Sequence, residues 1–156
     1  MKVASSFDSR LVHERPGKNS HYEVSIASPA DRETIYRLRF DIYSRELGQH
    51  QANAEARLCD EIDKWNQYLV VKEDGALTGF VSVTPPSAPR FSIDKYFRRD
   101  ELPLRTGETT YEVRLLTVIG SRRGSELAGL LMYAALRLVE AEGGHHIIGI
   151  GRREVM

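Results

Sequence analysis

Hydrophobic positions recur along the chain with two different periods, and each period predicts its own kind of element. Residues 29–47 have helical spacing, with two neighbouring apolar rows formed by Ile35, Leu38 and Ile42 and by Tyr36, Phe40, Tyr43 and Leu47. Ser28 can cap this helix, Pro29 suits its first position, Asp31 completes a capping box, and Gly48 can end it. A second helix is predicted over residues 125–142, ended by Gly143-Gly144.

Alternating or continuous apolar runs predict the strands. Residues 21–28 alternate and predict a first strand, and residues 67–86 predict two strands around a Glu-Asp-Gly turn, a hairpin that Pro85 and Pro86 end. Residues 111–119 predict the strongest strand and residues 145–151 the last one, while residues 91–97 could form a short helix.

The order of these elements predicts one α+β (mixed α/β) domain. A hairpin followed by a strand–helix–strand unit indicates a mixed sheet flanked by helices. Residues 1–20 lack periodicity and are predicted to be a flexible N-terminal arm, which leaves residues 21–156 as the domain. A chain of 156 residues fits this organisation.

Charge and composition exclude several classes of partner. The 22 basic and 22 acidic side chains cancel, so no bulk field draws the protein to nucleic acid or to an anionic membrane. No apolar stretch reaches the length of a signal peptide or a membrane span, and the single cysteine, Cys59, cannot form an internal disulfide. We therefore predict a cytoplasmic protein in which Cys59 fills apolar space.

The turn before the second helix is a candidate anion site. Arg122, Arg123 and Gly124 precede a helix N-terminus, where unpaired N–H groups and the helix dipole stabilise a phosphate. The alternative is a solvated basic turn that only caps the helix.

The element order and this turn resemble the GNAT acyltransferase superfamily. Its members carry a Gln/Arg-x-x-Gly-x-Gly/Ala turn, whose amides grip the pyrophosphate of coenzyme A or the phosphopantetheine of an acyl carrier protein. Arg123 and Ala128 fit that pattern, and Glu126 stands where its middle glycine is expected. The resemblance implies a central, mostly antiparallel sheet and an acyl-thioester co-substrate. It assigns donor binding to Arg122, Arg123, Gly124, Ala128 and Gly129, and to the backbone of Leu116 and Val118.

Three further stretches are similar to the autoinducer synthase and N-acyl amino acid synthase branch. They are "LRFDIYSRELG", "LCDEIDKWNQYLVV" and "YEVRLLTV", and they match that branch at Arg39, at Glu46 in the Glu-Leu-Gly run, at Asp60 and Asp63, and at Glu112. The branch has an arginine in the hairpin strand, whereas this chain has "FVSVTPP" with Ser82. Its strand arginine follows the glutamate by three residues, whereas Arg114 follows Glu112 by two.

These residues suggest N-acyl transfer to an amine. The attacking nitrogen must lose a proton, and strand alternation puts Glu112 and Arg114 on one face, where the carboxylate could accept it directly or through water. Arg114 would keep Glu112 ionised or orient the acceptor. The alternative for this pair is a structural ion pair across the sheet.

The acidic cluster is a candidate acceptor site. Asp60 and Asp63 could bind the ammonium of an amino-acid-like acceptor, near Arg39 and Glu46. A solvated acidic loop, with Arg39 in a salt bridge at the core edge, is the alternative. No Cys or His lies at ligand spacing within the cluster, so we expect no metal.

The resemblance implies further elements after the last strand, and "GRREVM" looks like the start of the next helix. We therefore expect a domain that is incomplete or is complemented, by a C-terminal segment or in a homodimer. A non-catalytic binding module within a larger biosynthetic protein, or an oligomerising domain, remains an alternative function.

Overall fold

The computed structural model describes residues 11–14, 21–46, 48, 51, 53–103 and 107–151. Its strands are β1 (Leu11–Glu14), β2 (His21–Ile26), β3 (Gln67–Glu73), β4 (Ala76–Thr84), β5 (Thr110–Val118) and β6 (His146–Ile148). The α-helices are α1 (Pro29–Arg39) and α2 (Leu127–Ala141), and a π-helical segment η1 (Phe40–Glu46) continues α1. Single 3-10 turns are η2 (Glu61–Lys64), η3 (Ser92–Lys95), η4 (Arg99–Glu101) and η5 (Gly120–Arg122).

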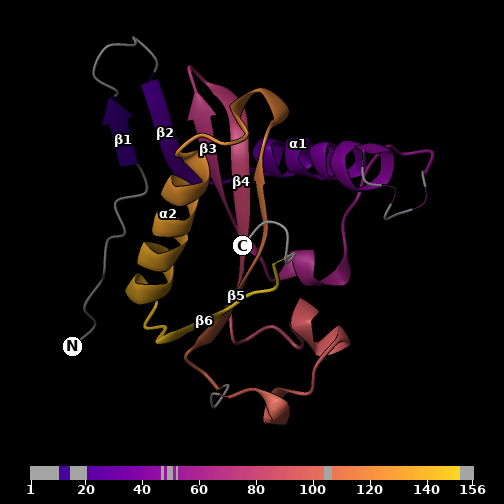
Figure 1. Cartoon of the computed structure of the whole chain (residues 1–156), viewed down its shortest axis with the longest axis vertical. Helices are drawn as coiled ribbons and strands as arrows, with labels where there is room; N and C mark the ends of the chain where they lie inside the picture. The colour runs from indigo at the N-terminus through magenta and orange to yellow at the C-terminus, as the bar shows by residue number, and fades with distance from the viewer. Residues whose placement is uncertain are drawn as a thin grey trace.

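The six strands form one sheet in sequence order (Figure 1). Neighbouring strands are antiparallel from β1 to β5, and β6 pairs with β5 in parallel. The parallel pair follows from the α2 crossover between β5 and β6. The predicted mixed, mostly antiparallel α+β sheet is confirmed.

Helix α1 begins where the capping box was predicted. Ser28 Oγ accepts the Asp31 N–H at 3.2 Å, and Asp31 Oδ2 accepts the Ser28 N–H at 2.9 Å. Ile35, Tyr36 and Phe40 are buried on the predicted apolar face. After Arg39 the chain continues as a π-helix, whereas the sequence predicted one uninterrupted α-helix, because apolar spacing over seven residues does not separate the two types.

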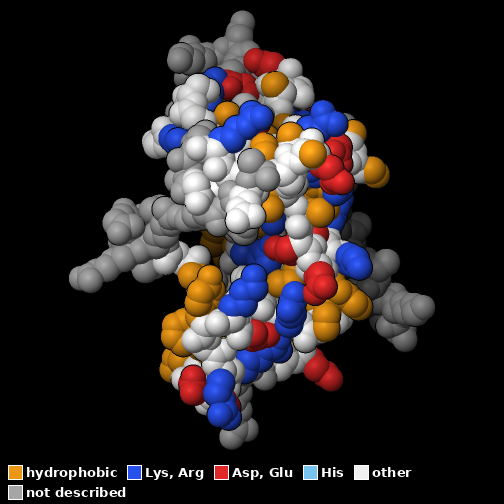
Figure 2. All heavy atoms as spheres, turned by 90° about the vertical axis from the view of Figure 1, so that its right-hand side faces the viewer, with side chains coloured by type: hydrophobic (Ala, Val, Ile, Leu, Met, Phe, Trp, Pro, Cys, Tyr) orange, Lys and Arg blue, Asp and Glu red, His pale blue; other side chains and the backbone are white. Residues whose placement is uncertain are grey.

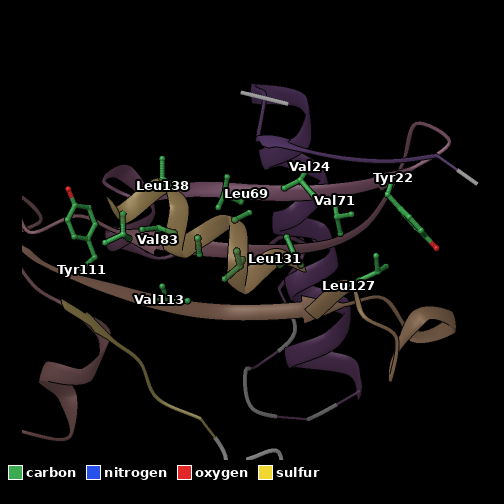
Figure 3. Close-up of a cluster of buried hydrophobic side chains, with 14 residues drawn as sticks. Tyr22, Val24, Leu69, Val71, Val83, Tyr111, Val113, Leu127, Leu131 and Leu138 are labelled. Carbon is green, nitrogen blue, oxygen red and sulfur yellow. The ribbon is translucent and has the colours of Figure 1, made fainter. Parts of the chain in front are cut away.

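Helix α2 covers one face of the sheet and closes the larger core. Leu127, Leu131 and Leu138 point from α2 toward the strands (Figure 3), where they join the core side chains Tyr22, Val24, Leu69, Val71, Val81, Val83, Tyr111 and Val113. A second cluster, of Ile35, Tyr36, Tyr68, Val70 and Phe80, lies on the α1 side. The sheet therefore separates an apolar α2 face from an α1 face that also receives polar side chains.

The β3–β4 hairpin has the predicted turn. Asp74 and Gly75 have φ angles of +50° and +83°, as the two central residues of a type I′ turn require.

Strand β5 contains a bulge at its middle. Arg114 lies opposite Ser82 and Thr117 opposite Phe80, so two residues, Leu115 and Leu116, face the single Val81. Leu115 has a φ of +57°, a left-handed conformation that is costly for a branched residue. A bulge of this kind leaves backbone groups outside the ladder.

Strand β6 leaves β5 soon after pairing begins. The parallel ladder ends at Glu112 and Ile148, and β6 is shorter than the predicted strand over residues 145–151. Gly149 still touches β5, since a Cβ there would lie 2.9 Å from the Val113 carbonyl oxygen. Beyond that point β5 continues to Val118 with β4 as its partner among the described strands.

Two details differ from the sequence-based expectations. Within the predicted arm, Leu11–Glu14 pairs with β2, and such an edge strand is stabilised by its partner rather than by its own pattern. Cys59 is exposed instead of filling the core.

Among the described helices, none has both the length and the apolar character needed to cross a bilayer.

Candidate acyl-transfer site

A buried charged cluster lies on the α1 face of the sheet and joins four elements. Arg39, the last residue of α1, donates through Nη1 to Asp63 Oδ2 at 2.7 Å and to the Tyr68 hydroxyl at 2.9 Å. The Tyr68 hydroxyl donates to Asp63 Oδ1 at 2.5 Å. Asp60 Oδ2 accepts from Arg39 Nη2 at 3.3 Å and also from Arg114 Nη2. Arg39, Asp60, Asp63 and Arg114, singled out from the sequence, therefore meet in one network.

The Asp-x-x-Asp spacing has a local structural cause. Asp60 is the N-cap of η2, and its Oδ1 accepts the N–H groups of Ile62 and Asp63 at 3.0 and 3.2 Å. Asp63 Oδ2 accepts the Asp60 N–H at 2.6 Å, which completes a capping box. Each of the two carboxylates thus accepts a hydrogen bond from the other residue's backbone N–H, in addition to its bonds with the arginines.

The cluster is not a solvated loop, and Arg39 does form the salt bridges that its structural alternative predicted. Arg39 and Asp63 are 4% and 3% exposed, while about a third of the Asp60 side chain, 35%, is exposed. Asp60 is therefore the carboxylate of the cluster that solvent reaches. Figure 2 shows this side of the molecule, where Lys and Arg side chains lie among Asp and Glu rather than forming a field of one sign.

Burial and pairing act in opposite directions on the ionisation of the cluster. Burial raises the pKa of Asp60, but the guanidinium groups of Arg114 and Arg39 lower it by more, so this pKa lies below its ordinary value. Burial lowers the pKa of Arg39, and Tyr68 and Asp63 more than compensate, so it lies above its ordinary value. Burial also raises the pKa of Tyr68 well above its usual range. These three shifts keep Arg39 charged, Asp60 ionised and the Tyr68 phenol neutral at neutral pH.

Three buried polar atoms at this cluster lack a hydrogen-bond partner among the described residues. They are Arg39 Nε, Ser82 Oγ and Arg114 Nε. Ser82 is fully buried in β4, directly opposite Arg114 and beside Tyr68.

Glu112 lies on the same face of β5 but does not pair with Arg114. Its buried carboxylate accepts the Ser92 N–H at 2.7 Å, the Ser92 hydroxyl at 2.6 Å and the Ile93 N–H at 2.9 Å. Glu112 therefore binds the N-terminus of η3, while Arg114 binds Asp60. Glu112 and Arg114 therefore do not form the structural ion pair that was the alternative for them.

The predicted donor-binding turn follows β5 directly. Leu116 and Val118 lie at and after the bulge, η5 covers Gly120–Arg122, and Gly124 has a φ of +80°. Ala128 and Gly129 lie in the first turn of α2, where backbone N–H groups have no partner within the helix. Glu126 is the N-cap of α2 and does not cap it with its side chain.

The basic residues of this turn differ in their surroundings. Arg122 Nη2 donates to Glu73 Oε1 at the end of β3, and this bond with Glu73, together with the charges of Glu73 and Glu126, raises its pKa despite some desolvation. Arg123 is exposed. The turn is therefore tied to the β3–β4 hairpin by Arg122, which a solvated basic turn would not require.

Sequence reasoning missed three functional neighbours and could not place one candidate. Tyr68, Asn66 and Ser92 all bond to predicted site residues: Asn66 Nδ2 donates to Asp63 Oδ1 at 3.3 Å. The bonds of Asn66 and Tyr68 to Asp63 span only three and five residues, but no spacing rule predicts them. The bond from Ser92 to Glu112 joins segments 20 residues apart. The side chain of Glu46 lies outside the described part of the chain. Over the described residues, no three His, Cys, Asp or Glu side chains are grouped as a metal site would need.

No family model matches the sequence, and no curated protein matches it. Solved structures do match its fold. A CoA-dependent acyl-homoserine lactone synthase, BjaI, bound to SAM and isopentyl-CoA, aligns with a TM-score of 0.68 at 20% identity, over 80% of this chain and 61% of that one. The AHL synthase LasI aligns with a TM-score of 0.72 at 15% identity, over 88% of this chain and 75% of that one. A GNAT family acetyltransferase from Brucella melitensis, in complex with acetyl-CoA, gives 0.57 at 17% identity, over 85% and 77%.

The chain thus has the same fold as these acyl-homoserine lactone synthases and this acetyltransferase, and the predicted resemblance is confirmed at the level of fold. The chain spans 61% of the length of BjaI.

Proposed function

We propose that the protein is a GNAT-type N-acyltransferase that moves an acyl group from a thioester to the amine of an amino-acid-like acceptor. The observation that carries this proposal is the bulged strand β5. It joins Glu112 and Arg114 at one end to the helix N-terminal turn at the other. The acyl-CoA, acetyl-CoA and SAM of the similar structures agree in kind with this assignment.

The donor is assigned to the β5–α2 side of the site. Coenzyme A or the phosphopantetheine of an acyl carrier protein would place its phosphate on the first-turn amides of Ala128 and Gly129, with Arg123 beside them. The thioester would lie along the edge of β5 near Leu116, where the bulge leaves backbone donors for the developing oxyanion. Both donors share this chemistry, and free acyl-CoA is the simpler one to test.

The acceptor is assigned to the charged cluster. Asp60 is the carboxylate with an exposed edge, so it would attract the ammonium, and Arg114 with its unpartnered Nε would orient an oxygen of the acceptor. Asp63 and Arg39 bond to Asp60, which in turn binds Arg114, so they would position the site rather than touch the substrate.

The chemical step needs one proton acceptor. The bound ammonium first releases one proton to solvent. The neutral amine nitrogen then attacks the thioester carbonyl carbon, the C–S bond breaks, and the second proton that nitrogen loses balances the one that the thiolate gains. Glu112 would take that proton, through a water where the amine does not reach it. The products are an amide and a free thiol.

Release of free thiol is the test. We expect purified protein with isopentyl-CoA or acetyl-CoA to release thiol only when a primary amine is present, in a panel that includes SAM, free amino acids and their amides. The amide product would be identified by mass spectrometry. Glu112→Gln should lower kcat at least about hundredfold while the Kd for CoA changes little. Full activity of that variant would remove Glu112 from the mechanism.

A non-catalytic binding module is the second candidate. It is favoured by the three donors on Glu112 and by the engagement of Arg122 with Glu73. In that case CoA compounds would bind, and no amine in the panel would release thiol. A cytoplasmic location, an acyl carrier protein partner, and completion of the site by a C-terminal segment or a second copy remain parts of the proposal.

A further inference from the structure

The surroundings of Glu112 suggest a role for a residue that the sequence gave no reason to single out. The carboxylate is fully buried, and three hydrogen bonds hold it. Oε1 accepts two of them, from the Ser92 hydroxyl at 2.6 Å and the Ile93 N–H at 2.9 Å. Oε2 accepts one, from the Ser92 N–H at 2.7 Å. Since a carboxylate offers about four acceptor positions, the position that stays open lies on Oε2.

The donors around Glu112 are neutral, and the charged groups nearby are engaged elsewhere. Arg99 of η4 binds Asp94 of η3 through Nε and Nη2 at 2.9 and 2.8 Å. The bond to Asp94 is the main cause of the raised pKa of Arg99, and the charge of Glu112 adds a smaller contribution. Arg114, two residues along β5, binds Asp60. Facing Glu112 from β4 and β6 are Thr84 and Ile148, which do not titrate.

The orientation of the Glu112 carboxylate therefore depends on these three donors. Two donors are backbone amides, which only a proline substitution would remove. Among the described residues that donate to Glu112, Ser92 is the one that does so through its side chain.

We propose that Ser92 is a positioning residue for the acyl transfer: its hydroxyl fixes the Glu112 carboxylate so that the open position of Oε2 faces the amine. This inference rests on the proposed function. Ser92 does not touch the substrate. It acts by holding the proton acceptor in place.

The test is kcat and KM in three variants, measured as thiol release from isopentyl-CoA with the best amine of the panel. Ser92→Ala removes one hydrogen bond to the Glu112 carboxylate, which should lower kcat about tenfold to hundredfold while KM for the thioester and for the amine stays within about threefold. Ser92→Thr, which retains the hydroxyl, should restore kcat to within about threefold of wild type.

Asp94→Asn is the matched control for simple loosening of the turn. Asp94 Oδ2 accepts the Phe91 N–H at 2.8 Å and binds Arg99, so this change weakens η3 without removing a donor from Glu112. It should lower the urea midpoint and leave kcat within about threefold of wild type. Where Ser92→Ala does not fold, Ser92→Cys, which keeps only a weak donor, is measured in its place.

The outcomes separate the two proposals. An active wild type with an unchanged kcat in Ser92→Ala, or with the same loss of kcat in Asp94→Asn, overturns the role of Ser92 alone. A wild type that binds CoA but releases no thiol with any amine overturns the proposed function, and the role of Ser92 with it.

Discussion

Removing the Asp63 carboxylate should be among the most destabilising single changes in the protein. Asp63 is 3% exposed and accepts hydrogen bonds from Arg39 Nη1, the Tyr68 hydroxyl, Asn66 Nδ2 and the Asp60 N–H. Asp63→Ala leaves a guanidinium that is 4% exposed with the longer contact to Asp60 as its charged partner among the described residues, beside the neutral Tyr68 hydroxyl. Breaking one side of a buried ion pair costs about 3–5 kcal/mol.

Urea denaturation followed by tryptophan fluorescence measures this loss. With a slope of about 2 kcal/mol per molar urea, the midpoint should fall by about 1.5–2.5 M. Asp100→Ala is the matched control, because Asp100 pairs with Arg98 at 2.7 Å while their side chains stay 64% and 75% exposed. That change should leave the midpoint within experimental scatter.

A double variant tests whether the pair is the cause. Arg39→Met with Asp63→Ala removes the stranded charge, so its loss should be clearly smaller than the sum of the two single losses. Strictly additive losses, or a loss below about 1 kcal/mol for Asp63→Ala, would refute a coupled, desolvated pair at this position.

The remaining predictions concern four other positions. Ser82→Ala should leave the urea midpoint unchanged or raise it, since the buried hydroxyl has no partner among the described residues. A loss of more than about 1 kcal/mol in the free energy of unfolding would mean that the hydroxyl is hydrogen-bonded. The lowered pKa of Asp60 means that its charge stabilises the fold above about pH 4 and that this contribution disappears as the pH falls through the folded-state pKa. Asp60→Asn should therefore destabilise at pH 7 and match wild type near about pH 2, as thermal unfolding at both pH values would record. Glu73→Gln releases the arginine of the donor turn and should tighten CoA binding on the order of threefold by calorimetry; weaker binding would contradict the donor assignment. Gly144→Ala would put a Cβ 2.3 Å from Val139 Cγ1, so about 1–3 kcal/mol of stability should be lost in the same urea assay.

The helices and most strands could be predicted from the sequence because their information is local. The Ser28–Asp31 capping box lies within four residues, and the leucines of α2 repeat at a fixed spacing. The type I′ turn needs only Asp74 and Gly75. Strand β1 and the π-helical segment η1 were not predictable in this way, since an edge strand depends on its partner and η1 has the same apolar spacing as an α-helix.

The site was predictable as a set of residues and not as a set of contacts. Arg39, Asp60, Asp63 and Arg114 were each named, but their meeting depends on pairing between segments up to 54 residues apart. The expected face of Glu112 and Arg114 followed from strand alternation, whereas their separate partners, the η3 amides and Asp60, lie on loops with no periodic signal. The role of Ser92 depends on the position of η3, whose N-terminus lies against Glu112 of β5.

The bulge at Leu115 and Leu116 also decides which side of the sheet the rest of β5 presents. Thr117 lies opposite Phe80 of the α1-side cluster, and Val118 packs against the α2-side core, the reverse of what unbroken alternation from Arg114 would give. A chain shortened by this one residue would turn the threonine into the apolar interior and the valine out of it. The number of residues in β5 is therefore more constrained than the residue type at Leu116. Many side chains could stand at that position, but the strand needs the extra residue to place Arg114 and Thr117 on the α1 side and Val118 on the α2 side.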